Sequence, residues 1–126
     1  MAIQQATIND TDTTLLQVSS DKTWAITNII VCNTYSPNDA DPENHTASFD
    51  LHIIKALSPG NPDVPDNRVT CIVRELSLPA GETFTFDSER IVLEDSDKVV
   101  LVAQEPGHDY GDGTTDLAAT VSYLEV

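Results

Sequence analysis

Short runs of β-branched and aromatic residues recur along this chain, and turn-forming residues interrupt them about every ten residues. The segment 76–103 shows the pattern best, because turn sequences at 79–82 and 94–97 separate candidate strands at 83–86, 91–93 and 99–102. No stretch of about ten or more residues has the apolar period of a helix. The chain is therefore predicted to be all-β.

Further candidate strands follow from the same criteria, at 3–8, 13–18, 23–34, 46–57, 68–78 and 116–126. About eight short strands at this spacing predict an antiparallel β-sandwich or jelly roll. The whole chain, residues 1–126, has the length of one such domain.

Three details of the strand connections are predicted as well. Asp87-Ser88 lacks the residues that a tight hairpin turn requires, so we expect an arch there that carries the chain from one sheet to the other. Residues 3–8 and 13–18 are expected to form an opening hairpin or one kinked edge strand. Simple alternation of strand direction puts the loop at 35–45 opposite the long loops at 58–67 and 105–115.

The alternation of residues 46–57 predicts a strand with one buried face. Phe49 and Leu51 belong to the buried side. The polar set that alternates with them, including Asp50 and His52, is expected on the other face.

Charge excludes some classes of partner. Six basic and twenty-one acidic residues give a net charge of −15, which repels the phosphates of nucleic acid. In a particle that contains nucleic acid, this charge favours a place on the outside. The apolar runs are far shorter than the roughly 18 residues of a membrane span, and residues 1–5 lack the features of a secretory signal. We expect neither a direct nucleic-acid partner nor a membrane, and synthesis in the cytoplasm without processing.

Cys32 and Cys71 each lie within an apolar run. The favoured interpretation is two small buried hydrophobic side chains, and the alternative is a disulfide that joins two strands. A Trp after the first cysteine would suit an immunoglobulin domain, but Trp24 precedes Cys32, which disfavours that subtype.

The loops contain the candidate ligands. Asp39, Asp41 and Glu43 offer carboxylate oxygens for calcium, although the loop lacks the spacing of an EF-hand, and the favoured interpretation is no bound metal. His108 and Tyr110 could bind a sugar or a cation, but a solvated glycine-rich loop explains them more simply.

No catalytic signature is present. The three histidines do not accompany a nucleophile motif, zinc-ligand spacing is absent, and the glycines at 107, 111 and 113 do not precede a helix that could bind phosphate. The sequence predicts a protein that is not an enzyme and has no cofactor.

Several segments together resemble the small β-sandwich virion proteins of tailed bacteriophages, especially marine and cyanobacterial ones. The matching segments are 29–34 (IIVCNT), 51–54 (LHII), 76–87 (LSLPAGETFTFD), 90–94 (RIVLE) and 119–126 (ATVSYLEV). The resemblance covers most of the chain from residue 23 onward, and it consists of strands and turns rather than active-site residues.

The resemblance implies a structural protein of the virion that is made in the host bacterial cytoplasm and works as a homo-oligomer with coat or tail protein. A capsid decoration protein on the outer surface is the favoured role, and a tail, neck or baseplate component is the alternative. We expect its loops to contact partners, through Tyr35, Pro37, Pro59, Pro62, His108 and Tyr110. A rival hypothesis is a carbohydrate-binding module that attaches to a host surface through the loop around Tyr110.

Overall fold

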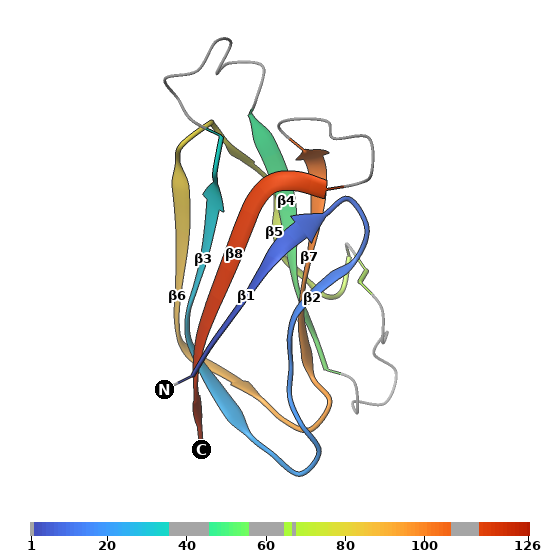
Figure 1. Ribbon diagram of the computed structural model, residues 1–126. Helices are drawn as coiled ribbons and strands as arrows, with labels where there is room; N and C mark the ends of the chain where they lie inside the picture. The colour runs from blue at the N-terminus through green and yellow to red at the C-terminus, as the bar shows by residue number, and fades with distance from the viewer. Residues whose placement is uncertain (1, 36–45, 56–64, 67, 107–113) are drawn as a thin grey trace.

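The computed structural model describes residues 2–35, 46–55, 65–66, 68–106 and 114–126 (Figure 1). Within these ranges the chain forms eight β-strands and no helix. In chain order they are β1 (Ala2–Asn9), β2 (Thr13–Gln17), β3 (Trp24–Asn33), β4 (Ala47–Ile54), β5 (Cys71–Leu78), β6 (Thr83–Leu93), β7 (Lys98–Pro106) and β8 (Thr114–Glu125).

The strands form two four-stranded antiparallel sheets that pack face to face. Sheet A has the order β1-β8-β3-β6, and sheet B has the order β2-β7-β4-β5. Strands that stand equally far from the two ends of the chain therefore pair: β1 with β8, β2 with β7, β3 with β6 and β4 with β5. An eight-stranded double sheet of this kind is a jelly roll, so the predicted fold class is confirmed.

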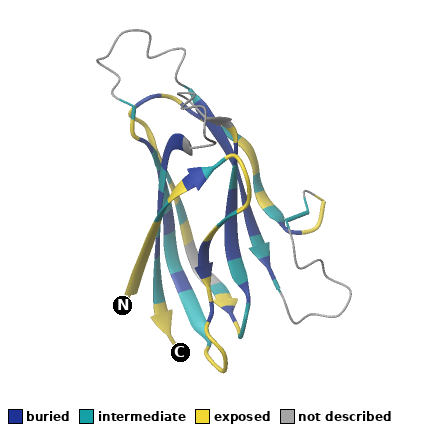
Figure 2. Ribbon diagram, turned by 45° about the vertical axis from the view of Figure 1, so that its right-hand side comes forward, coloured by how far each residue is buried: buried dark blue, intermediate teal, exposed yellow. Residues whose placement is uncertain are grey.

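The hydrophobic core lies between the two sheets. Residues that alternate along the central strands point into it and are fully buried, among them Ile29 and Val31 of sheet A and Phe49 and Leu101 of sheet B. The rings of Phe49 and Phe84 pack edge to face, with their centroids 5.8 Å apart, so this pair connects the two sheets directly. Figure 2 shows the middle strands of sheet B as the most deeply buried part of the molecule.

The turns predicted around β6 are present. Glu82 N donates to Pro79 O at 3.0 Å, and Gly81 has a φ of 79°, a left-handed conformation that glycine adopts without steric penalty. At the other end of β6, Asp97 N donates to Glu94 O at 3.0 Å. These two turns set the length of β6.

The prediction of an arch at Asp87-Ser88 is wrong. β6 continues through these residues within sheet A, where Asp87 pairs with Asn28 and Ile91 pairs with Ile26. The pairing shifts between these two positions, so a bulge in β6 absorbs the polar residues without a change of sheet. An edge strand tolerates such a bulge because its outer side needs no partner strand.

The predictions for residues 3–8 and 13–18 are also wrong, since these residues form neither an opening hairpin nor one kinked edge strand. β1 is an edge of sheet A and pairs with β8, whereas β2 is an edge of sheet B and pairs with β7. The polar residues between them form a turn, in which Asn9 N donates to Thr13 Oγ1 at 2.9 Å. The sequence identified the turn residues correctly but contained no local signal for the partner strands.

The predicted distribution of the long loops is half right. The strand ends that flank 35–45 and 107–113 lie at one end of the sandwich, because Ala47 pairs with Pro106 and Thr34 N donates to Asp116 O at 2.8 Å. The ends of β4 and β5 that flank the third loop lie at the opposite end (Figure 1). The prediction treats β6 as two strands, which reverses the expected direction of each later strand and so the expected end of the last long loop. Residues 36–45, 56–64 and 107–113 themselves lie outside the described residues.

Candidate functional site

Most of the loop residues predicted to bind partners lie outside the described residues, namely Pro37, Pro59, Pro62, His108 and Tyr110. The same is true of the calcium candidates Asp39, Asp41 and Glu43. Tyr35 is described, half-buried, and its backbone N donates to Asn33 Oδ1 at 3.1 Å. It therefore lies against the end of the sandwich where β3 ends.

Across the described ranges, no three His, Cys, Asp or Glu side chains are placed to share a metal ion. The same ranges contain no helix with the length and apolar character of a membrane span.

The two cysteines are free thiols on different sheets, Cys32 in β3 and Cys71 in β5. Both are half-buried rather than buried as expected. For Cys32 the reason is the alternation of β3, which turns Val31 into the core and Cys32 outward. Burial raises the pKa of the Cys71 thiol, and Asp50 adds to this rise, so the reactive thiolate is disfavoured.

A buried carboxylate is the most unusual polar group of sheet B. Asp50 is 1% exposed, although it points away from the core, and three donors surround it. Arg74 Nη1 lies 2.6 Å from Oδ2, Gln104 Nε2 lies 2.8 Å from Oδ2, and the backbone N of Glu75 lies 2.7 Å from Oδ1. Charge-assisted hydrogen bonds of this kind compensate for the desolvation of the carboxylate.

A β-bulge in β5 brings a backbone donor to the Asp50 carboxylate. Phe49 pairs with Leu76 and Leu51 with Val73, so two residues of β5 face Asp50 in a β-bulge. One of them, Glu75, has a φ of 48°, which is strained for a residue other than glycine. In this conformation the backbone N–H of Glu75 points toward Oδ1 of Asp50.

His52 lies two residues further along the same face of β4 and is also 1% exposed. Its Nδ1 lies 2.9 Å from Thr70 Oγ1. Burial lowers the pKa of His52, and the nearby Arg74 lowers it further, while Asp50, Asp12 and Asp66 oppose the shift. The imidazole is therefore held in its neutral form.

Asp50 and His52 contradict the expectation that the polar face of β4 is open to solvent. β4 is a central strand of sheet B, and side chains from both of its neighbours, such as Arg74 of β5 and Gln104 of β7, reach over it. The polar groups are engaged with one another and closed to a substrate.

The buried histidine predicts a pH dependence of stability. In the unfolded chain His52 has a pKa near the ordinary 6.5, and the folded pKa is lower. Below pH 6.5 the unfolded state binds the extra proton first, so the free energy of unfolding falls until the folded pKa is passed. Urea unfolding at about pH 7.5 and pH 5.5 should show this fall in the wild type and a smaller one in His52→Gln. Equal falls in both proteins would contradict it.

The outer face of sheet A is the broadest candidate for an interaction surface. Strand pairing and alternation define its positions, none of which is buried. They are Ile3, Gln5 and Thr7 of β1; Ala118, Thr120, Ser122 and Leu124 of β8; Ala25, Asn28, Ile30 and Cys32 of β3; and Thr83, Thr85, Asp87 and Val92 of β6. We call this surface the sheet A face.

The sheet A face carries little charge. Among these fifteen described side chains Asp87 alone is charged, and it lies on the edge strand β6. A surface designed for solubility has charged residues at about 25–35% of its positions, which would place four or five here. Three apolar side chains of this face are instead well exposed: Ile3 at 60%, Val92 at 47% and Leu124 at 41%.

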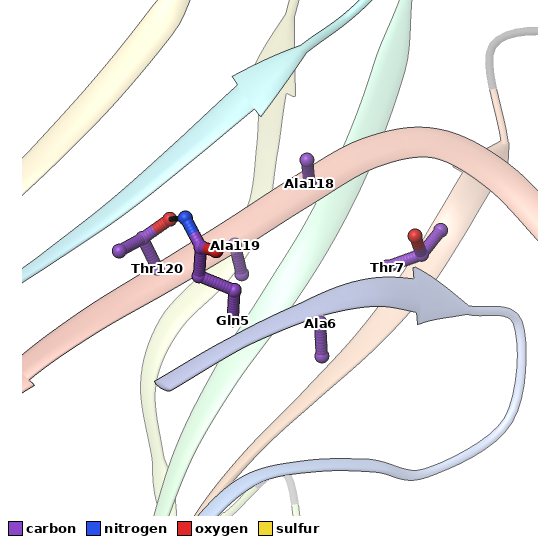
Figure 3. Close-up of a pocket in the computed structure, with 6 residues that line it drawn as sticks. All are labelled: Gln5, Ala6, Thr7, Ala118, Ala119 and Thr120. Atoms are coloured by element: carbon purple, nitrogen blue, oxygen red, sulfur yellow. Dashed lines mark hydrogen bonds between the residues drawn. The ribbon is translucent and has the colours of Figure 1, made fainter. Parts of the chain in front are cut away.

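A shallow hollow of about 310 Å³ lies on this face between β1 and β8. Figure 3 shows Gln5 reaching across to Thr120, where its Nε2 lies 3.4 Å from Thr120 Oγ1, and the small side chain of Ala118 leaves space beside Thr7. The lining contains no acid, base or nucleophile beyond hydroxyl and amide groups. It suits contact with another surface better than binding of a small charged ligand.

Comparison with known proteins gives one weak structural match. No protein-family model matches the chain, and no curated protein matches it. A search of solved structures finds a chain from "Structure of infectious bursal disease virus Gx strain", with 15% sequence identity and a TM-score of 0.41. The match covers 99% of this chain and 36% of that chain, so this chain spans about a third of its length.

Proposed function

We propose that this chain is a non-enzymatic structural protein of a virus particle. The observation that carries the proposal is the strand order of its two sheets, because eight-stranded jelly rolls serve as capsid domains as well as lectins and cupins. The resemblance of its strands and turns to small virion proteins of tailed bacteriophages favours the first of these classes.

Within the particle we propose the role of a capsid decoration protein on the outer surface of a phage head. The net charge of −15 supports an outside position, since the nucleic acid within repels acidic surfaces. Contacts with coat protein would come from the loops and strand edges at the ends of the sandwich. A tail, neck or baseplate position uses the same contacts at a different site.

The proposal includes no catalytic activity. The absence of activity in this proposal is supported by the burial and the pKa of the described reactive side chains. Asp50 and His52 are closed to solvent, and the thiol of Cys71 has a raised pKa. An enzyme needs such groups to be within reach of a substrate. Here they hold β4 and its neighbouring strands together.

Fractionation of infected cells that produce the chain tests this proposal. We expect the chain to sediment with intact particles through a density gradient and to remain with separated heads after heads and tails are parted. Electron microscopy should then show it at repeating positions on the outer shell, with interfaces above about 1,000 Å². An acidic host protein of similar size provides the control.

Recovery of the chain only at the top of the gradient, together with that control, would overturn the virion role. If the chain is recovered with tails alone, the virion role stands, but the chain is a tail component and not a decoration protein of the head.

A further inference from the structure

We propose that the sheet A face is a self-association surface, on which a second copy of this chain packs its own sheet A face about a two-fold axis. This inference goes beyond the virion role, since two copies can pair whether or not a particle is present. It rests on the charge, shape and area of the face.

The low charge of the face is compatible with a second copy as the partner. A surface that met a basic partner would benefit from acidic side chains, and this chain has twenty-one of them available. A face without them can meet another acidic surface without repulsion, whereas two carboxylates about 5 Å apart repel by roughly 1–3 kcal/mol near a protein surface. Another copy of the chain, with its net charge of −15, is an acidic partner that is always present.

The shape of the face favours flat packing of sheet against sheet. Three of the four outward positions of β8 carry small side chains, namely Ala118, Thr120 and Ser122, and the shallow hollow at Ala118 can receive a protruding side chain. Ile3, Leu124 and Val92 are exposed apolar groups that such packing would cover. Sheets packed in this way lie about 10 Å apart, as they do within a sandwich.

The area is sufficient for a weak, specific dimer. A rise of about 3.3 Å per residue and a strand spacing of about 4.8 Å give each outward residue roughly 32 Å² of sheet. The fifteen described positions therefore cover about 500 Å² on one copy and about 1,000 Å² on two, near the lower limit of specific interfaces. The relief of real side chains makes the accessible area larger than this flat estimate.

Two other surfaces are less suited to a second copy. The outer face of sheet B carries Arg74, Glu75 and Lys98, so it keeps the charge that the sheet A face lacks. Edge-to-edge pairing through β6 would meet the bulge between Asp87 and Ile91, which interrupts a regular ladder of hydrogen bonds.

Sedimentation equilibrium of the purified full chain tests the inference. We expect a reversible dimer whose fraction rises between about 1 and 100 µM, as suits an interface of this size. Thr120→Glu places a charge at the centre of the face, between Gln5 and Ile30, and should weaken the dimer at least about 100-fold. Added salt should partly restore it, since salt screens the repulsion.

Two further variants complete the experiment. Ser77→Glu adds the same charge at an exposed position of β5 on sheet B and should leave the dimer unchanged. Gln5→Glu keeps the size of an exposed side chain on the sheet A face and should weaken the dimer even if Thr120→Glu fails to fold. Thermal unfolding of each variant establishes that it is folded.

A wild-type chain that stays monomeric at about 100 µM would overturn the inference, and so would folded Thr120→Glu and Gln5→Glu variants that dimerise as the wild type does. If the wild type is monomeric and Thr120→Glu loses only its attachment to particles, another virion protein occupies the face. That result would overturn self-association and leave the virion role intact.

Discussion

Replacing Phe49 by alanine is expected to lower the free energy of unfolding by about 3–5 kcal/mol, the usual range for a fully buried phenylalanine. Phe49 is 0% exposed, and its ring contacts Phe84 of the other sheet at 5.8 Å. The substitution removes apolar surface from the core and leaves a cavity between β4 and β6. Urea unfolding of wild type and variant measures the difference.

Matched variants show whether burial is the cause. Phe49→Leu retains most of the apolar volume and should lose less than Phe49→Ala. Val92→Ala, on the sheet A face at 47% exposure, should change stability by less than about 0.5 kcal/mol. A loss at Phe49 as small as the loss at Val92 would contradict the packing of the two sheets around Phe49.

Replacing Arg74 by methionine is expected to lower the free energy of unfolding by about 3 kcal/mol at neutral pH. Arg74 itself is half exposed, but its removal leaves the Asp50 carboxylate, at 1% exposure, without an opposite charge. The backbone N of Glu75 and the amide of Gln104 remain as donors, and they do not neutralise it.

A double-mutant cycle isolates this effect. In an Asp50→Asn background this buried position carries no charge, so Arg74→Met should there lose much less stability than in the wild type. Arg68→Met, at an exposed position before β5, controls for the loss of one positive charge from an acidic protein. Equal losses for Arg74→Met in the two backgrounds would show that the pair with Asp50 is not the cause.

Much of the fold could be predicted from the sequence because its signals are local. The turn at 79–82 depends on Pro79 and Gly81, and the burial of Phe49 and Leu51 follows from the apolar alternation of one strand. These features fixed the number of strands and the fold class to a good approximation. The one error in the count, at Asp87, arose because a bulge and a turn use similar polar residues.

The candidate surfaces could not be predicted because they depend on register between distant segments. Asp50 and Arg74 are 24 positions apart, and the sequence around either residue contains no signal that the two side chains form a pair. The sheet A face combines positions of β1, β8, β3 and β6, each unremarkable in its own strand. Its low charge becomes visible only once those four strands are aligned.

The pairing of strands from the two ends of the chain has a consequence for how the chain can fold. Gln5 and Thr120, which meet in the β1-β8 ladder, are 115 positions apart, so forming that pair first would close a very long loop in one step. The β4-β5 pair closes a much shorter loop, and each pair around it encloses the one before. Assembly from β4-β5 outward thus divides one large entropic penalty into several small ones.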